Sequence, residues 1–245
     1  MRFLVTNEAR AVGIEAPVIA LYQNVRQATE EEIKVYQPTI SEVMERVKKS
    51  RDSILAKPEV VGFRELFSRL GYPKTVPAGE RLLSFVDRGW KSYGNLVDSY
   101  NLPAFEDAVG IGVHDARSLA DVYIVYKRAV GNETIVPSFK EKRETIKAED
   151  LTYGFYNSER EFVPLAWFGK KDVDNRDFQL QPDTTAFLLT AIGNARTSQE
   201  YNIDICKRVY TNLQKTCPEV MMELYPAQFI DNKALAKILE PAQSK

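Results

Sequence analysis

Residues 151–169, LTYGFYNSEREFVPLAWFG, decide the fold class. This stretch holds two runs rich in aromatic and β-branched residues, LTYGFY at 151–156 and REFVPLAWFG at 160–169, joined by the polar residues NSER. Two such runs around a short polar segment are typical of a β-hairpin. Similar runs, DVYIVYKR at 121–128 and TTAFLLTAI at 184–192, lie on either side. We therefore expect a mostly antiparallel or mixed sheet in the second half of the chain.

The first hundred residues are mainly helical in pattern. TEEE at 29–32 has the spacing of a capping box, and the segments 40–55, 62–70 and 79–88 have apolar residues at helical spacing. A strand or two is expected within residues 12–22, and IDICKRVYTNLQKTC at 203–217 has the pattern of a helix that closes the domain. These patterns predict an α+β fold, in which N-terminal helices pack on a layered sheet and a C-terminal helix closes it. With no linker visible, residues 1–245 are expected to form one domain.

Composition and charge exclude several classes of protein. The chain has 245 residues, 44% of them hydrophobic, and 33 basic against 34 acidic residues, which excludes extensive disorder and a generally polycationic surface. Two cysteines and one histidine exclude a disulfide framework, a four-cysteine zinc site and most metalloenzyme schemes. We expect no metal and no cofactor. No apolar run approaches the ~18–20 residues of a membrane span, so we expect a cytoplasmic protein without a membrane partner.

The segment NLVDSYNLPAF at 95–105 carries the first candidate residues for chemistry. Asp98 and Asn101 are three residues apart, so they share one face if the segment is helical. Asn101 also precedes Pro103 closely, and an asparagine in that place is equally suited to a helix C-cap or a turn. The pattern leaves both interpretations open.

A β-like run, VGIGVHD at 109–115, holds the second candidate group. Gly110 and Gly112 alternate within it, and glycine inside a strand marks either a close approach by a ligand or a plain bulge. His114 falls on the same side of an extended strand as Gly112, and it is the candidate general base. The alternative is a histidine without any chemical role.

The polar segment GKKDVDNRDFQLQPDTT at 169–185 holds four carboxylates, Asp172, Asp174, Asp177 and Asp183. Several carboxylates within a short segment suggest acid–base or metal chemistry. The glycine and the distal glutamate of a calcium loop are missing. A solvated loop between two strands is the alternative.

Basic residues gather in two places. Between residues 62 and 92 they are Arg64, Arg69, Lys74, Arg81, Arg88 and Lys91, and the segment KEKRETIK at 140–147 adds more. A few lysines and arginines on one face are enough to hold a phosphate backbone. The same residues also suit an ordinary solvated helix surface. We assign the first group as candidate RNA-binding residues.

The order of these segments resembles the B3/B4 domain of the phenylalanyl-tRNA synthetase beta subunit, above all its free-standing versions. The resemblance covers residues 58–192 and runs through FRELFSRLGYPK, ERLL, NLVDSYNLPAFEDAVGIGVHD, PLAWFGKKD and PDTTAFLL. Its most specific part is D-x-Y-N at Asp98–Asn101, followed by G-x-G-x-x-D from Gly110 to Asp115. The catalytic, anticodon-binding and DNA-binding-like modules of the synthetase are not visible in the sequence, so aminoacylation by this chain is not expected.

The resemblance implies a pocket in which a water molecule attacks the ester of a misacylated tRNA. It assigns Asn101 to the family's pocket asparagine, and it places Gly112, instead of a histidine, at the family's pocket histidine. His114 is then the nearest substitute. The family's acidic residue falls at Asp172 or Asp174, and Trp167 borders that segment as a possible wall of an amino-acid pocket. Asp98, Gly110, Gly112 and Asp115 complete the expected substrate-binding set.

These observations predict a tRNA-binding protein that hydrolyses misacylated tRNA in trans, with the aminoacylated 3′ end of tRNA as its partner and no DNA partner. Backbone N–H groups at Gly110–Gly112 are the expected donors to the oxyanion. Two alternatives stay open: a binding module of the same fold that holds RNA or a protein without catalysis, and a small-molecule hydrolase or amino-acid binder.

Overall fold

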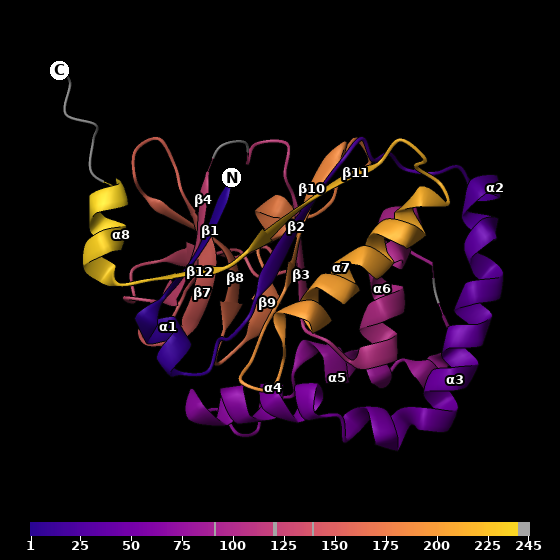
Figure 1. Cartoon of the computed structure of the whole chain (residues 1–245), viewed down its shortest axis with the longest axis horizontal. Coiled ribbons are helices and arrows are strands. Elements are labelled where there is room, and N and C mark those ends of the chain that lie inside the picture. Colours follow the sequence, from indigo (N-terminus) through magenta and orange to yellow (C-terminus); the bar gives the residue numbers. More distant parts are fainter. Residues whose placement is uncertain (91, 120–121, 139, 240–245) are drawn as a thin grey trace.

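Two β-sheets share one hydrophobic core at the centre of the protein (Figure 1). The computed structural model describes residues 1–90, 92–119, 122–138 and 140–239. The larger sheet has the order β12-β1-β4-β7-β8-β9, the smaller sheet has the order β11-β2-β10-β3, and a separate hairpin pairs β5 with β6. The strands are β1 (Arg2–Thr6), β2 (Val18–Gln23), β3 (Ile111–Asp115), β4 (Tyr123–Arg128), β5 (Thr134–Ile135), β6 (Glu144–Thr145), β7 (Leu151–Tyr156), β8 (Phe162–Phe168), β9 (Asp172–Asp174), β10 (Ala186–Ala191), β11 (Met221–Pro226) and β12 (Gln228–Ile230).

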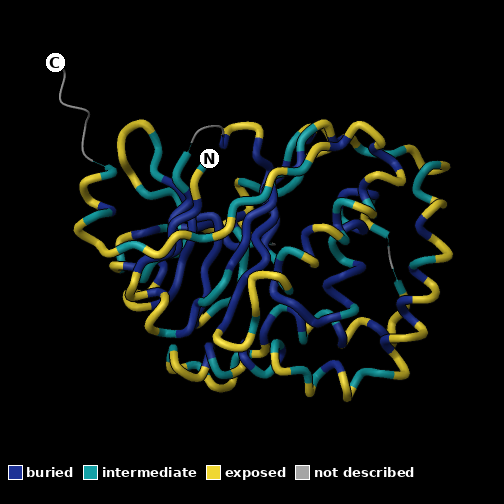
Figure 2. The backbone as a smooth tube through the Cα atoms, in the orientation of Figure 1, coloured by how far each residue is buried: buried dark blue, intermediate teal, exposed yellow. Residues whose placement is uncertain are grey.

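Helices surround the two sheets, which are the most deeply buried part of the chain (Figures 1 and 2). They are α1 (Asn7–Ala11), α2 (Glu30–Ile33), α3 (Gln37–Leu55), α4 (Pro58–Arg69), α5 (Ala78–Leu83), α6 (Asn95–Asp107), α7 (Gln199–Gln214) and α8 (Asn232–Leu239), with 3-10 turns η1 (Lys34–Tyr36), η2 (Val86–Arg88) and η3 (Arg176–Phe178). The apolar face of α7 packs on the smaller sheet, α8 packs on the outer face of the larger sheet, and α4 contributes aromatic side chains to the core between the sheets. None of the described helices has the length and apolar character needed to cross a membrane.

The structure confirms the α+β class and most of the expected elements. The hairpin of residues 151–169 is β7 and β8, and the expected strands at 121–128 and 184–192 are β4 and β10. The sheet is mixed, because β1 pairs in parallel with both β4 and β12 while the other strand pairs are antiparallel. The capping box is also present: the Thr29 side chain accepts from the Glu32 backbone, and the Glu32 carboxylate accepts from the Thr29 N–H.

Three expectations need correction. Asn101 is neither a C-cap nor a turn residue, since α6 continues past it to Asp107. The segment 169–185 is not a plain loop, because it contains the short strand β9 and the turn η3. The helix that was expected to close the chain is α7, and two strands and α8 follow it.

Helix α6 contains Pro103 in its interior, where proline leaves one carbonyl without its helical donor. That carbonyl belongs to Ser99, four residues earlier. The side-chain amide of Asn212 on α7 donates to it at 3.0 Å. This bond satisfies the carbonyl that Pro103 leaves open and ties the two helices together.

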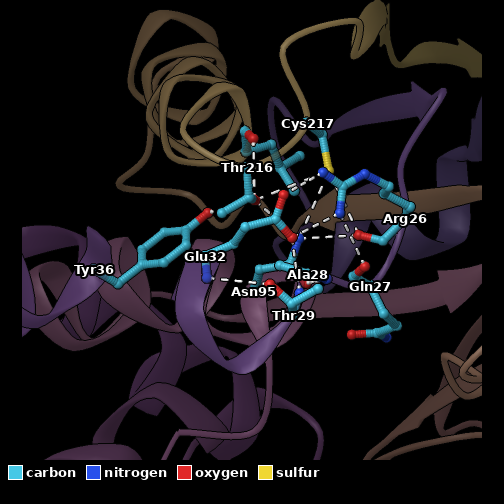
Figure 3. A network of polar contacts seen from close by, with 10 residues as sticks. Arg26, Gln27, Ala28, Thr29, Glu32, Tyr36, Asn95, Thr216 and Cys217 are labelled. Carbon is cyan, nitrogen blue, oxygen red and sulfur yellow. Dashed lines mark hydrogen bonds and ion pairs between the residues drawn. The ribbon is translucent and has the colours of Figure 1, made fainter. Parts of the chain in front are cut away.

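A buried polar network joins the segment before α2 to the first turn of α6 and the end of α7 (Figure 3). We call it the Asn95 network, after its fully buried central residue. The Asn95 amide oxygen accepts from the Ala28 N–H at 2.9 Å, and its nitrogen donates to the Arg26 carbonyl at 3.0 Å and to Thr216 Oγ1 at 2.9 Å. Each polar atom of the Asn95 side chain is therefore hydrogen-bonded inside the protein.

Candidate functional site

The edges of the two sheets meet where β9 lies beside β3. In β9, Asp172 pairs with Phe168 and Asp174 pairs with Ala166, and Phe168 and Ala166 belong to the core between the sheets. Directly paired residues share one face of a sheet, so both carboxylates turn toward that inner space. Asp174 Oδ1 lies 3.9 Å from the imidazole Nε2 of His114 on β3. Carboxylates from one sheet and a histidine from the other therefore come together at this junction.

Gly112 makes this close approach possible. A Cβ at position 112 would overlap the hydroxyl oxygen of Tyr153 on β7 and would lie 3.2 Å from Asp174 Oδ1. The Tyr153 hydroxyl is also hydrogen-bonded to His114 Nε2, at 2.6 Å. A hydroxyl from the larger sheet thus occupies the place that a side chain at 112 would take. We call Asp172, Asp174, His114 and Tyr153, gathered around Gly112, the carboxylate cluster.

Burial controls the charges of the carboxylate cluster. The pKa of Asp174 is raised to about 8, first by burial and then by the nearby carboxylate of Asp172, although a hydrogen bond from the Val113 N–H acts in the opposite direction. Its side chain keeps 32% of its surface exposed, so water still reaches it. Burial also raises the pKa of Asp172, which accepts from the Ala78 N–H at 2.6 Å. Asp174 is the group of this cluster that changes protonation near neutral pH and contacts solvent.

His114 has the opposite character. It is fully buried, and burial lowers its pKa to about 3, so the ring is neutral at physiological pH. Its Nδ1 has no hydrogen-bond partner among the described residues, and the same is true of the Tyr126 hydroxyl in the nearby core. A neutral, buried imidazole held by Tyr153 shapes the cluster and is not exposed at the surface.

Along β3, every second backbone N–H points to the neighbouring strand β10, and the others point to the free edge of the sheet. The Ile192 N–H donates to the Gly110 carbonyl, and the Ala116 N–H donates to the Ala186 carbonyl. In an antiparallel pair this pattern directs the backbone groups of the even-numbered residues, Gly112 included, toward β10. The Gly112 N–H is therefore used within the sheet, and it is the N–H groups of Ile111 and Val113 that point to the free edge. Of the oxyanion donors expected at Gly110–Gly112, only the Ile111 N–H points to the free edge of β3.

Helix α6 turns one face toward the carboxylate cluster. Burial raises the pKa of Tyr100, and the nearby charges of Asp174 and Asp98 raise it further. Val97, Tyr100 and Asn101 are all half-buried. The Asn101 amide makes no hydrogen bond to His114, Asp172 or Asp174.

The structure does not bring three of the expected site residues into the carboxylate cluster. Trp167 pairs with Val173, hence on the opposite face of the larger sheet, where its indole N–H donates to Asp150 Oδ2 at 2.7 Å. Asp98 is buried and accepts from Ser92 Oγ and the Tyr93 N–H, so it anchors the turn before α6. Asp115 accepts from Arg117 and Thr184 at the far end of β3.

The remaining expected residues have mixed surroundings. Gly110 lies against the Phe63 ring, which a Cβ there would approach to 3.1 Å. Arg64 is held by Glu80 in a two-bond ion pair, the Arg88 guanidinium lies over the Phe85 ring, and Arg69 and Lys74 are exposed. Arg81 alone of the described group contacts β9, donating to the Asp172 carbonyl at 2.9 Å. Lys91 lies outside the described residues.

Sequence reasoning did not find Tyr153 and Tyr100. Both occupy positions that the strand and helix patterns assign to ordinary core residues, and nothing local distinguishes their hydroxyl groups. The alternation Asp-Val-Asp at 172–174 was the available signal for β9, because period-two acids place two carboxylates on one face of a strand. Within the described part of the chain, no group of three or more His, Cys, Asp or Glu side chains has the geometry to hold a metal ion.

Comparison with known proteins gives similarity in structure and none in sequence. No protein-family model matches the sequence, and no curated protein matches it at a significant level. Among solved structures, the fold is similar to an N-terminal fragment of the phenylalanyl-tRNA synthetase beta-subunit from Pyrococcus horikoshii, with a TM-score of 0.48 and 11% identity. The alignment covers 95% of this chain and 52% of that chain. The protein thus spans about half the length of the fragment that it resembles.

Proposed function

We propose that the protein is a free-standing domain of the B3/B4 type that binds tRNA and hydrolyses the ester of misacylated tRNA. The observation that carries the proposal is Asp174, a partly exposed carboxylate whose pKa is raised to about 8 beside His114 and the free edge of β3. A carboxyl group with a pKa near the working pH is suited to general acid–base catalysis. The ordered resemblance of residues 58–192 to that family supports the choice of substrate.

The proposed reaction uses Asp174 as the general base. Its carboxylate takes a proton from water while the water oxygen bonds to the ester carbonyl carbon. The negative oxygen that forms accepts a hydrogen bond from an N–H at the free edge of β3, with the Ile111 N–H as our candidate donor. The bond between the carbonyl carbon and the ribose oxygen then breaks, and the ribose oxygen takes the proton from Asp174. The products are a free amino acid and an RNA with a free 3′-terminal ribose.

The neighbouring residues have positioning roles in this proposal. Asp172 raises the proton affinity of Asp174, and its own carboxylate is held by the Ala78 N–H and lies 3.8 Å from the Arg81 guanidinium. His114 and Tyr153 fill the space behind Gly112 and keep bulk water out of it. Asn101 is half-buried on α6 beside Tyr100, and in this proposal its amide contacts a substrate carbonyl.

Purified protein incubated with a panel of misacylated tRNAs tests the proposal directly. We expect release of the amino acid from at least one of them, at a rate that rises with pH and levels off above the pKa of Asp174. The rate should be lost in Asp174→Asn. Absence of acceleration with every tRNA of the panel would remove the hydrolase function.

A binding module without catalysis is the second candidate, favoured by the burial of His114. The histidine is fully enclosed and its Nε2 is engaged by Tyr153, so the side chain nearest the family's histidine position does not reach a substrate. In that case RNA would bind, with an affinity that falls steeply between ~50 and ~200 mM salt, and no ester would be cleaved. Measuring binding and cleavage on one preparation separates the two candidates.

A further inference from the structure

The β5–β6 hairpin and the segment 169–176, which contains β9, form one structural unit beside the carboxylate cluster. The Ser138 N–H and hydroxyl both donate to the Asp174 carbonyl, at 2.9 and 2.8 Å. The Arg176 N–H donates to the Val136 carbonyl at 2.8 Å, and Pro137 forms a β-bridge with Asn175. Ile135 and Ile146 of the hairpin bury Trp167 from the outer side of the larger sheet. The hairpin is therefore fixed to β9 by backbone bonds and by its own small core.

This unit presents a concentration of positive charge that neither sequence segment shows alone. The basic residues of the hairpin and of the β8–β9 segment are Lys140, Lys142, Arg143, Lys147, Lys170, Lys171 and Arg176, and all of them except the half-buried Lys171 are exposed. We call this set the basic hairpin surface. Glu144 binds both Lys140 and Lys171, and Arg143 lies 3.5 Å from Asp177. No described carboxylate forms an ion pair with Lys142 or Lys170, so their charges are available to a ligand.

The basic hairpin surface is continuous with the rest of the site. The Lys147 ammonium donates to the Tyr72 hydroxyl at 3.1 Å, which joins the hairpin to the loop before α5 and its exposed Lys74. On the other side, Lys171 immediately precedes Asp172, whose carbonyl accepts from Arg81. Cations from three separate parts of the sequence therefore lie around this end of the larger sheet, and Arg81 and Lys171 are the ones next to Asp172.

The chemistry of this surface fits a polyanion better than a protein. Protein interfaces are anchored by buried aromatic and other large apolar side chains, and none of the exposed large hydrophobic residues of the described chain falls within 136–147 or 169–176. Exposed lysines and arginines with no such anchor among the described residues of 136–138, 140–147 and 169–176 are the arrangement that binds phosphate backbones. We propose that the basic hairpin surface binds the phosphate backbone of an RNA. This deepens the proposed function, on which it rests only for the position of the RNA 3′ end near Asp174.

The test compares two charge-reversal variants of the full chain. Lys142→Glu/Lys170→Glu changes the unpaired lysines of the surface, and Lys48→Glu/Lys49→Glu makes the same change of charge on the exposed face of α3. Binding of a fluorescently labelled, deacylated tRNA is followed by anisotropy over a range of salt. We expect the first variant to raise Kd at least about 10-fold at 100 mM salt and to lower the salt slope by about 1.5–2. The α3 variant should bind like the unchanged protein.

A second readout separates this inference from the hydrolase proposal. Cleavage of a 2′(3′)-O-aminoacyl adenosine, too small to reach the hairpin, should proceed equally in the unchanged protein and the hairpin variant. If the hairpin variant loses RNA binding and the unchanged protein cleaves no ester, the basic hairpin surface is supported as the RNA-binding surface and the hydrolase proposal is wrong. Equal RNA binding by both charge variants, or no RNA binding by the unchanged protein, would overturn the surface. If the double variant fails to fold, the single variant Lys142→Gln, at an exposed side chain, is compared with the unchanged protein in the same binding assay.

Discussion

Two buried polar groupings in this protein have opposite states of hydrogen bonding. In the Asn95 network, both amide atoms of the central residue are bonded to backbone and side-chain partners within the protein. In the carboxylate cluster, His114 Nδ1 has no partner among the described residues, and the Asp172 carboxylate lies close enough to raise the pKa of Asp174 further. The first arrangement is complete without a ligand. The second contains polar atoms, such as His114 Nδ1, that only a proton, water or a ligand can satisfy.

This difference separates a structural role from a chemical one. Buried polar groups are normally hydrogen-bonded, because an unsatisfied group costs about 1–3 kcal/mol. A grouping that tolerates such a cost, and holds a carboxylate at a raised pKa, is a candidate functional site. The comparison therefore assigns stability to Asn95 and chemistry to Asp174, and the following predictions test that division.

The largest effect is expected for Asp174→Asn. The amide keeps the shape of the side chain and removes the proton acceptor, so ester hydrolysis should fall by about 100- to 10,000-fold. The melting temperature should not fall, because a neutral group replaces a carboxylate whose ionisation is opposed by burial. Rates and thermal melting on the same samples check this, with Asp204→Asn on the exposed side of α7 as the control. Wild-type turnover in Asp174→Asn would assign the chemistry elsewhere.

Asn95→Ala should have the next largest effect, and on stability alone. It removes the acceptor of the Ala28 N–H and the donor to the Arg26 carbonyl, so we expect a loss of about 2–4 kcal/mol in the free energy of unfolding. The specific activity of the folded fraction should be unchanged. Urea unfolding with a parallel activity assay measures both quantities. A variant of unchanged stability would show that the network does not hold α2, α6 and α7 together.

Asn101→Ala is the counterpart of Asn95→Ala, because both replace an asparagine of α6. Asn101 is half-buried and makes no hydrogen bond to the cluster, so its loss should alter stability by less than about 0.5 kcal/mol. If it holds the substrate, hydrolysis should slow about 10- to 150-fold, equivalent to ~1.5–3 kcal/mol of barrier. Melting temperature and turnover are measured together. A lower melting temperature with intact turnover would instead assign Asn101 to the support of α6.

The last effect concerns how the stability of the folded protein changes with pH. Since the pKa of Asp174 is about 8 in the folded protein and its ordinary value is 3.8, the folded state binds more protons than the unfolded state between these values. The contribution of Asp174 is therefore fully present below about pH 4 and is lost as pH rises toward 8. Asp174→Asn should match the unchanged protein in melting temperature near pH 4 and exceed it increasingly as the pH rises to 8. A constant difference across this range would contradict the raised pKa.

Local sequence patterns predicted the parts of the fold that depend on local physics. Strands β4, β7, β8 and β10 have alternating or continuous apolar residues, and the Thr29–Glu32 capping box marks the start of α2. The strand β9 has only the short alternation Asp172, Val173 and Asp174, which is too brief to predict a strand by itself. It forms because β8 and the β5–β6 hairpin supply its partners. Tertiary contacts of this kind leave no periodic signal in the sequence.

The sequence was enough to predict several residues of the candidate site, but it did not predict how they are arranged in space. The suspicion that Gly112, His114, Asp172 and Asp174 belong together arose from the family resemblance, and the structure places them at one sheet junction. The role of Tyr153 depends on a contact with β3 across the space between the sheets. The position of Trp167 depends on the hairpin that covers it. Pairings between distant segments set both, so neither follows from the residue types alone.

The pairing of the first strands with the last ones has a consequence for how the chain folds. Strand β1 lies between β4 and β12, and β2 lies between β10 and β11, so each early strand has one neighbour from the final part of the described chain. During synthesis, β1 and β2 must wait for nearly the whole polypeptide before both of their edges are covered. Non-local pairing of this kind slows folding and leaves strand edges open to wrong partners. We expect refolding in milliseconds to seconds or slower, and a nascent chain halted before β11 to depend on chaperones for its solubility.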